Sequence, residues 1–284
     1  MLQDIQRKFE ESFDIPFISS YGMDNHGVWY EIGPKSTAKE YFTIKIRFVN
    51  DFRLIMELNP DLYSKPFVED IGCASAEKKN QFLAFARIFQ DRKAKIQLQV
   101  NRQAASVDTF EDWPHHWDHL GLRISRSPVC EGHIDHEHII LEWGLSMMAM
   151  ILSLANIVPL EIPNEVPDSN QAEGKAQKVL VTKYERSPIN RMLCLAAKGY
   201  NCSVCGMNFE KTYGDIGLNF IHVHHSVPVS QMGDNYVVNP EKELFPVCPN
   251  CHAMLHRCDP PLSIEELSAI LLARKGDASQ FAIV

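Results

Sequence analysis

The 284-residue sequence lacks a recognisable signal peptide, a low-complexity tract and an internal repeat. Residues 1–11 are charged and amphipathic, without the apolar centre of a secretory leader. A disulfide framework is also missing, because four of the eight cysteines form two Cys-x-x-Cys pairs and the other four are scattered. These absences favour a globular protein of a reducing compartment, and we expect it to be cytoplasmic.

Positive charge is scarce, and its distribution is uneven. The chain carries 28 Lys and Arg against 36 Asp and Glu, a net charge of −8. Residues 1–172 hold 17 basic against 25 acidic residues, whereas residues 173–258 hold 9 against 7. Phosphate contacts supply most of non-specific DNA affinity, so the overall acidity argues against tight non-specific binding. A nucleic acid would be repelled by the first half and accepted by the second.

One nearly uncharged run, residues 139–158, has the length of a membrane span. Polar or small residues recur along it at spacings of four and three, namely Glu142, Ser146, Ala149, Ser153 and Asn156. They make one stripe down an otherwise apolar helix. We therefore predict a core helix of a soluble protein and no membrane association.

The first half predicts an α+β domain, a mostly antiparallel sheet with helices on one side. Apolar residues alternate along 28–32 and 41–58, the second stretch forming a hairpin that turns at Asn50 and Asp51. Further elements are expected as helices at 1–13, 76–94 and 134–157, and a strand at 96–100, with an irregular segment after that strand.

A proline-rich stretch, 159–174, is typical of an exposed linker. We therefore predict a recognition, partner-binding or regulatory domain at 1–158, a linker at 159–177 and a second domain at 178–284. Its expected elements are strands at 178–182, 218–225 and 244–247, and helices from Ser187 to Gly199, at 250–257 and from a Ser263/Glu266 capping box to Arg274, stopped by Gly276. The side chains of Arg186, Arg191 and Lys198 are expected on the solvent-exposed side of the first of these helices.

Metal-ligand spacings dominate this second domain. Cys202/Cys205 and Cys248/Cys251 are separated by 42 residues and suit one tetrahedral structural zinc. His252 and His256 lie one helical turn apart, as two ligands of a second metal would. The adjacent pair His224-His225 ends an apolar run, where imidazoles are expected to bind a ligand or transfer a proton.

These motifs occur in a specific order: Tyr184-Glu185-Arg186, the first Cys-x-x-Cys, Val223-His224-His225, then Cys248-Pro249-Asn250-Cys251-His252. In that order the segment at about 178–257 resembles the HNH endonucleases, and among them the restriction-type proteins of the McrA kind. The resemblance implies a C-terminal ββα-metal domain with a structural zinc.

The resemblance also implies roles. His224, His252 and His256 would hold a divalent metal (Mg²⁺, Mn²⁺ or Ni²⁺), and His225 would be the general base that activates water. Glu243 stands where the family has its central asparagine, so we expect it to support His225, with Asn239 as a weaker candidate. Adjacent strand residues point to opposite faces, so His224 and His225 would need a distorted strand end to serve one site.

Other candidates have weaker signals. Arg186, Arg191 and Lys211 are expected to contact DNA phosphates, although a solvated face explains them equally well. We expect His222 to face away from the metal. In the first domain no spacing matches a known metal site, although several residues could ligate one: His115, His116, His119, His133, Asp135, His136 and His138.

The expected function is metal-dependent DNA cleavage, by nicking or double-strand breakage, in restriction or anti-phage defence. One alternative is a non-catalytic, zinc-stabilised adaptor that binds nucleic acid or protein. Another is an accessory nickase of a multi-protein, Zorya-type defence system, its acidic first domain docking other defence proteins or shielding the cleft. The sequence leaves open the oligomeric state, the DNA specificity and the physiological metal.

Overall fold

The computed structural model describes residues 1–35, 42–60, 64–129, 135–155, 187–227, 238–258 and 260–278, with side chains described as far as Arg274. The predicted linker at 159–177 and the predicted strand at 178–182 lie outside these residues. Below, the N-terminal region means the described residues up to 155, and the C-terminal region means those from 187 onward.

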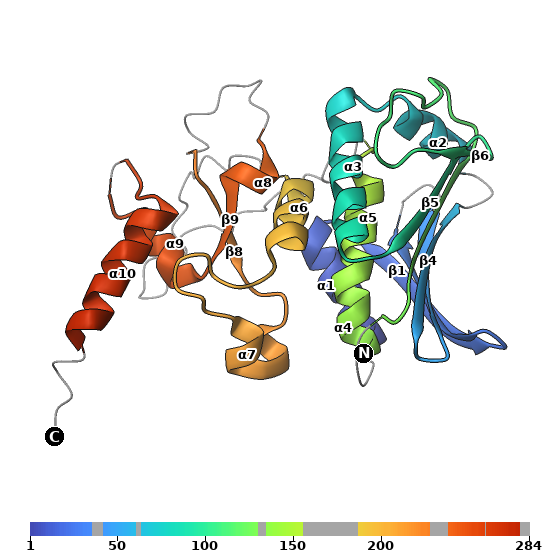
Figure 1. The fold of residues 1–284 in the computed structure, drawn as a ribbon. Helices are drawn as coiled ribbons and strands as arrows, with labels where there is room; N and C mark the ends of the chain where they lie inside the picture. The colour runs from blue at the N-terminus through green and yellow to red at the C-terminus, as the bar shows by residue number, and fades with distance from the viewer. Residues whose placement is uncertain are drawn as a thin grey trace, which may run out of the picture.

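The N-terminal region is an antiparallel sheet with helices over one face (Figure 1). The strand order is β1-β2-β3-β4-β7-β5-β6. Its elements are α1 (Leu2–Phe13), β1 (Phe17–Asp24), β2 (Gly27–Pro34), β3 (Phe42–Val49), β4 (Arg53–Pro60), α2 (Lys65–Gly72), α3 (Ala76–Asp91), β5 (Lys95–Val100), β6 (Gln103–Ala105), β7 (Leu120–Arg126), α4 (His136–Ile139), the π-helical turn η1 (Ile140–Gly144) and α5 (Leu145–Leu152). The predicted α+β class is confirmed.

The hairpin of β3 and β4 follows directly from its alternating sequence. Ile44, Ile46 and Phe48 point into the core and are almost completely buried, while the residues between them lie on the other face. The strands pair in register from Phe42↔Pro60 to Val49↔Arg53. The chain reverses at Asn50 and Asp51, as predicted, and both residues adopt positive φ.

Four elements of the N-terminal region were missed by the sequence prediction: β1, α2, β6 and β7. β7 lies in the segment predicted to be irregular, yet it sits between β4 and β5 in the sheet. Its residues Leu120, Leu122 and Ile124 are buried and alternate with exposed or half-buried ones. This period of two was the available signal, and the Trp- and His-rich stretch before it obscured where the strand begins.

The predicted core helix is present as the continuous segment α4, η1 and α5. The residues of α5 are all buried, including Ser146 and Ala149 of the predicted polar stripe. The Ser146 hydroxyl donates to the Glu142 carbonyl at 2.9 Å, and the Ser153 hydroxyl donates to the Met150 carbonyl at 2.7 Å. The hydroxyls are therefore satisfied within the helix, which allows their burial. Among the described helices, none has the length and apolar character required to cross a membrane.

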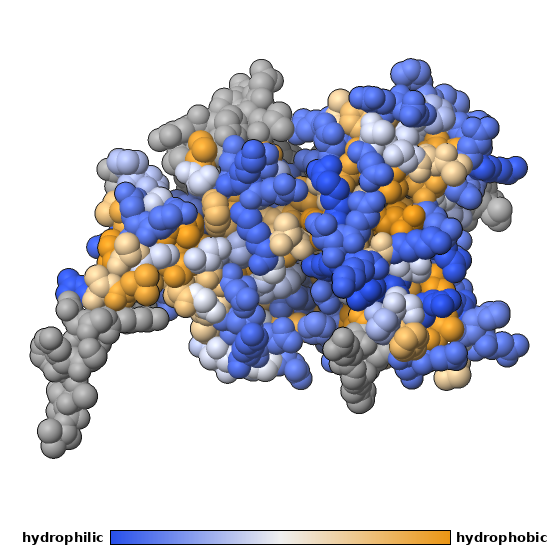
Figure 2. All heavy atoms as spheres, viewed as in Figure 1, coloured by the Kyte–Doolittle hydropathy of each residue, from blue (hydrophilic) through white to orange (hydrophobic). Residues whose placement is uncertain are grey.

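The C-terminal region is built on a two-stranded sheet of β8 and β9. Its elements are α6 (Pro188–Lys198), α7 (Phe209–Tyr213), the 3₁₀ turn η2 (Gly214–Gly217), β8 (His222–His225), α8 (Pro240–Glu243), β9 (Leu244–Val247), α9 (Pro249–Leu255) and α10 (Ile264–Ala278). The Ser263/Glu266 capping box forms as predicted, with reciprocal bonds of 2.8 and 3.1 Å. Gly276 does not stop α10, which continues to Ala278. Figure 2 shows apolar atoms at the surface over α10, where Ile270 and Leu272 are exposed.

Helix α6 belongs to two hydrophobic cores. Met192, Leu193 and Ala196 pack in the core of the N-terminal region, whereas Leu195 packs with the cysteines, β8, β9 and α9. The prediction that the Arg191 and Lys198 side chains lie on the solvent-exposed side of α6 is wrong, because both are partly buried and donate hydrogen bonds to backbone carbonyls. Arg191 donates to the Ile221 carbonyl at 2.9 Å, and Lys198 donates to the Leu244 carbonyl at 2.6 Å. These cations fix the β8–β9 sheet to α6.

Gly144 lies at a close approach of the core helix to the sheet and to α1. A Cβ at this position would lie 2.8 Å from Ile46 Cδ1 and 3.2 Å from Phe9 Cζ. Replacing a helical glycine with alanine normally stabilises a helix by about 1 kcal/mol. Here we expect Gly144→Ala to destabilise the protein by roughly 1–3 kcal/mol, because the core is overpacked. Urea unfolding measures the change.

A double-mutant cycle with Ile46→Val provides the control, since this second substitution removes the Cδ1 atom that the added methyl group would meet. The combined variant should lose less stability than the two single variants together. Additive losses would show that the close contact is not the cause.

Candidate metal centre and active site

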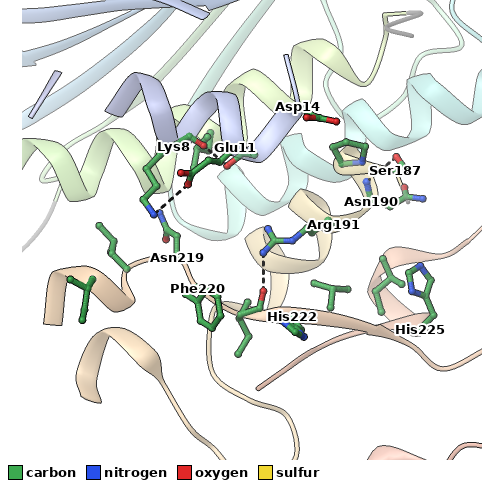
Figure 3. Close-up of a pocket in the computed structure, with 18 residues that line it drawn as sticks. Lys8, Glu11, Asp14, Ser187, Asn190, Arg191, Asn219, Phe220, His222 and His225 are labelled. Atoms are coloured by element: carbon green, nitrogen blue, oxygen red, sulfur yellow. Dashed lines mark hydrogen bonds and ion pairs between the residues drawn. The ribbon is translucent and has the colours of Figure 1, made fainter. Parts of the chain in front are cut away.

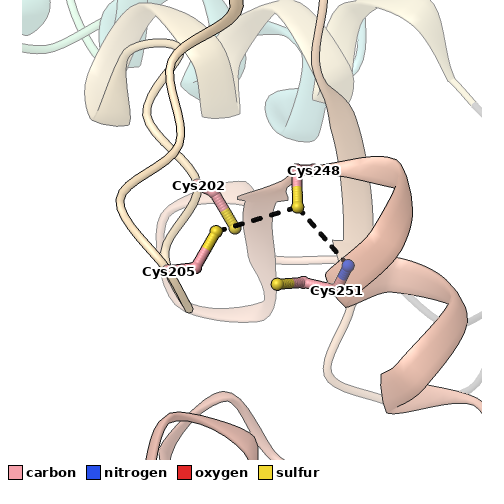
Figure 4. Close-up of side chains that lie close together, drawn as sticks. All are labelled: Cys202, Cys205, Cys248 and Cys251. Atoms are coloured by element: carbon pink, nitrogen blue, oxygen red, sulfur yellow. Dashed lines mark hydrogen bonds between the residues drawn. The ribbon is translucent and has the colours of Figure 1, made fainter. Parts of the chain in front are cut away.

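The two Cys-x-x-Cys pairs meet in one cluster (Figure 4). The Sγ atoms of Cys202, Cys205, Cys248 and Cys251 all lie within 4.8 Å of one another, and those of Cys205 and Cys248 are 3.8 Å apart. The first pair sits in the turn after α6, where the Ser203 N–H donates to the Pro246 carbonyl of β9 at 2.8 Å. The second pair opens α9, and Cys248 Sγ accepts the Cys251 N–H at 3.4 Å as its N-cap.

The cysteine cluster fits a structural zinc ion. Burial and the neighbouring Cys248 and Cys205 thiols raise the pKa of Cys251, so four thiolates would repel one another in this space. A divalent cation with tetrahedral sulfur ligands removes this repulsion and holds the thiolate form. The donor set and the mutual distances therefore suit zinc.

Three histidines form a second cluster beside β8. Ligand nitrogens of His224, His252 and His256 lie within 4.8 Å of one another, and their ring centroids are 5.0 to 5.5 Å apart. His252 and His256 project from one face of α9, as their spacing predicted. His224 is only 4% exposed, and its Nδ1 atom is buried without a hydrogen-bond partner among the described residues. A buried, unsatisfied imidazole nitrogen within a histidine cluster fits a bound cation.

The environment of His224 keeps its imidazole neutral. Burial lowers its pKa to about 4, and the nearby His256, His252 and His225 act in the same direction. The neutral imidazole is the form that binds a metal. The trio is therefore ready to accept a cation at neutral pH without first losing a proton from His224.

The expectation that His222 faces away is wrong. His222 Nδ1 lies 3.1 Å from His252 Nδ1, and the two rings meet edge to face at 5.3 Å. His222 and His224 are two residues apart on β8, so they share a face. This parity was the signal in the sequence that could have placed His222 beside the trio.

His225 lies on the other face of β8, as the alternation along a strand requires. It lines a cavity of about 560 Å³ together with residues of α1 and α6 (Figure 3). The pairing of β8 with β9 stays in register through His225↔Leu244, so the strand end carries no bulge. His225 is nevertheless close enough to His224 to influence its pKa. The two adjacent histidines thus look onto two sides of one short strand.

Glu243 and Asn239 act together at the short helix α8. The Asn239 side chain accepts the N–H groups of Glu241 and Lys242 at 3.2 Å, and Glu243 Oε2 accepts the Asn239 N–H at 2.9 Å. The Glu243 carbonyl also accepts the Ser226 N–H at 2.8 Å, immediately after His225. Glu243 therefore fixes the end of β8 through its backbone, and its carboxylate caps α8.

The predicted phosphate-binding residues are dispersed. Arg191 lines the same cavity as His225, and burial lowers the pKa of its guanidinium. Lys211 is exposed on α7 and does not line this cavity. Arg186, with Tyr184 and Glu185, lies outside the described residues.

A third group of potential ligands occurs in the N-terminal region. Glu69, His116 and Asp118 place ligand atoms within 4.8 Å of one another, with His116 Nε2 at 3.3 Å from Asp118 Oδ1. His116 and Asp118 are both exposed, and an ordinary surface ion pair accounts for their proximity. Of the histidines considered for a site here, His133 lies outside the described residues.

Comparison with known proteins agrees with the geometry of the C-terminal region. Residues 202–257 match the family model described as HNH endonuclease. The match contains all four cysteines, the His224–His252–His256 trio and His225, and leaves out the N-terminal region. No curated protein and no solved structure matches the chain.

The cysteine cluster predicts a zinc-dependent fold. We expect Cys251→Ser to release bound zinc and to unfold the C-terminal region, because metal binding contributes about 10 kcal/mol or more to small zinc folds. Metal analysis of the purified protein and thermal unfolding measure both effects. Cys194→Ala is the matched control, since Cys194 is buried outside the cluster and burial raises its thiol pKa to about 11. Equal zinc content in the two variants would contradict the assignment.

His224 predicts a pH dependence for protein that retains zinc but carries no other divalent cation. The folded-state pKa of about 4 lies below the ordinary value of 6.5, so the unfolded chain binds this proton first. Stability should be complete above pH 6.5, fall as the pH drops toward 4, and then level off. The loss is roughly 3 kcal/mol at most, at about 1.4 kcal/mol per pKa unit.

Urea unfolding across this pH range, compared with His224→Asn, isolates the contribution of His224 from that of the other titrating groups. The wild-type minus variant difference should change as the pH falls, in the direction of lost wild-type stability. A difference that does not change with pH would show that His224 titrates normally.

Proposed function

We propose that the HNH endonuclease domain at residues 202–257 makes this protein a metal-dependent DNA endonuclease that hydrolyses phosphodiester bonds. The observations that support this most are the convergence of the imidazoles of His224, His252 and His256 and the buried, unsatisfied Nδ1 of His224. Structural histidines normally satisfy their ring nitrogens with hydrogen bonds. This cluster instead has the composition and spacing of a ligand set.

In this proposal His224, His252 and His256 hold a divalent cation, Mg²⁺, Mn²⁺ or Ni²⁺. When bound, the cation would stabilise the negative charge that develops on the scissile phosphate and the leaving oxygen. His225 takes the proton of the attacking water, since a neutral imidazole near physiological pH is a suitable base. Glu243 assists by fixing the strand end that carries His225.

DNA binding in this proposal falls to the C-terminal region, where the chain has a small excess of basic residues. Arg191, Lys211 and Arg186 contact phosphates. Arg191 is the one of these with support from its position, because it lines the cavity that also contains His225. The acidic N-terminal region repels DNA elsewhere, which restricts productive contact to the HNH side.

The biological setting we propose is restriction or anti-phage defence in the cytoplasm, on the analogy of McrA-like nucleases or of the nickase in Zorya-type systems. The N-terminal region then selects the target, docks a partner or regulates cleavage. Its coupling to the nuclease is supported by α6, which packs in both cores, and by His138, whose Nε2 lies 3.6 Å from Glu210 Oε1 of α7. A monomer with one such site would nick DNA, and a dimer could cut both strands.

A second candidate function is a non-catalytic, zinc-stabilised adaptor. It is favoured by one observation, the regular alternation of β8, which puts His225 on the face opposite to His224. An adaptor needs the cysteine cluster but no base, so its binding would be insensitive to His225.

The endonuclease proposal predicts nicking of supercoiled plasmid in the presence of Mg²⁺, Mn²⁺ or Ni²⁺. We expect His225→Ala to slow cleavage about a hundredfold or more, which is the usual effect of losing a general base. His252→Ala should abolish cleavage and the binding of the second cation, while zinc remains in the cysteine cluster. Agarose gels and metal titration provide the two measurements.

His116→Ala is the matched control, because this exposed histidine lies in the N-terminal region outside the trio and the cavity. Its cleavage rate should equal that of the wild type. Intact plasmid with every metal, together with DNA or protein binding that His225→Ala leaves unchanged, would instead identify the adaptor.

A further inference from the structure

The cavity beside His225 is formed jointly by the N-terminal and C-terminal regions. Its walls come from the second half of α1, the first turn of α6 and the segment that leads into β8 (Figure 3). Its volume of about 560 Å³ falls within the range of small-molecule sites. None of its α1 residues falls within the HNH match. The cavity is therefore a feature of this particular combination of regions.

An unsatisfied donor lies at one end of the cavity. Asn219 Nδ2 is buried and has no hydrogen-bond partner among the described residues. A buried amide without a partner costs about 1–3 kcal/mol, which a ligand acceptor would recover. Lys8 lies beside Asn219 in Figure 3. A cation and an unsatisfied N–H donor side by side suit an anionic oxygen.

Two cations, Lys8 and Arg191, and two carboxylates, Glu11 and Asp14, line the cavity. Lys8 Nζ lies 3.6 Å from Glu11 Oε2, and Glu11 also pairs at 3.0 Å with Arg7, which in turn lies 3.5 Å from Asp4. Arg191 contributes a further cation to the cavity, and its bond to Ile221 uses one of the five guanidinium donors. The first turn of the eleven-residue α6, with Ser187 and Asn190, lies toward Asp14 and away from Lys8 in Figure 3.

The rest of the cavity offers different chemistry. Phe220 is 48% exposed and lines the cavity with its ring braced by Phe209 at 4.8 Å. An exposed ring of this kind provides a face on which a base stacks. Asp14, at the C-terminal end of α1, supplies an acceptor away from Lys8 in Figure 3. The phosphate of a nucleotide would contact Lys8 and Asn219, its base would stack on Phe220, and a hydroxyl or amino group would donate to Asp14.

We propose that this cavity binds a nucleotide, with its phosphate at Lys8 and Asn219 and its base against Phe220. The inference rests on the proposed nuclease function only for the biological role of the bound nucleotide, which would lie in a cavity lined by both His222 and His225. Two sources share this chemistry: a nucleotide of the DNA strand being cleaved, or a free mononucleotide that acts on His225.

The test measures binding without cleavage. Isothermal titration of the full chain, with zinc present and other divalent cations absent, compares deoxyadenosine monophosphate with deoxyadenosine. We expect the monophosphate to bind at least about tenfold more tightly, since a charged phosphate adds charge-assisted bonds. A short single-stranded oligonucleotide that displaces the monophosphate identifies DNA as the source, and one that does not displace it identifies a free nucleotide.

Asn219→Asp is the decisive variant, because it keeps the size of the side chain and replaces the donor with a carboxylate. Asn219 has φ of 60°, which Asp and Gly also tolerate, so Asn219→Asp and Asn219→Gly should both fold. We expect Asn219→Asp and Lys8→Gln to weaken monophosphate binding at least about tenfold. Lys65→Gln is the matched control, because Lys65 is also a helix-surface lysine paired with a glutamate on its own helix, at 3.7 Å.

Equal affinity for nucleoside and nucleotide, or unchanged affinity in Asn219→Asp, would overturn the inference. The proposed nuclease function would survive that result if the wild type nicked plasmid and His225→Ala slowed nicking as expected. Conversely, nucleotide binding as expected with intact plasmid would leave the cavity assignment standing and remove the nuclease function.

Discussion

The arrangement of the C-terminal region depends on the convergence of four cysteines from two distant parts of the chain. The sheet of β8 and β9 has only two short strands, which provide little apolar surface for an independent core. Cys248 ends β9 and caps α9, so one residue sets both where the strand stops and where the helix starts. The helix start in turn determines where His252 and His256 point. The cysteine cluster thus positions the histidine trio without belonging to it.

Helix α6 transmits this geometry to the N-terminal region. Its residues enter both cores, and α3 holds it through polar contacts as well, since Arg92 donates to the Ala196 carbonyl at 2.8 Å and Gln81 donates to Asn190 at 3.0 Å. On its other side Arg191 and Lys198 bond to the chain at β8 and β9. A displacement of the core helices would therefore reach β8 through a short series of direct contacts. This connection gives the N-terminal region a physical route to the strand that carries His224 and His225.

The sequence was sufficient where the signal is local. Alternation predicted the β3–β4 hairpin, and ligand spacing predicted that the four cysteines act together and that His252 and His256 do. It was insufficient where position depends on tertiary packing. Charged residues such as Arg191 and Lys198 look like surface residues until their backbone partners are known, and nothing in the sequence brings α1 next to Asn219. β7 alternates with a period of two, but its place between β4 and β5 depends on long-range pairing that the local pattern does not specify.

The two faces of β8 explain why two histidines that adjoin in sequence could serve one reaction. His224 contributes to the cluster on the α9 side, while His225 lines the cavity on the α1 and α6 side. β9 is the neighbour of β8 in a sheet of only two strands, and no bulge rotates His225 toward the trio. A group that contacts both imidazoles must therefore lie across the end of the strand rather than over one face. A phosphodiester of an extended strand has this reach, since adjacent phosphates and bases project to different sides of its backbone. Under the proposed function, substrate shape rather than strand distortion would bring the base and the cation site together.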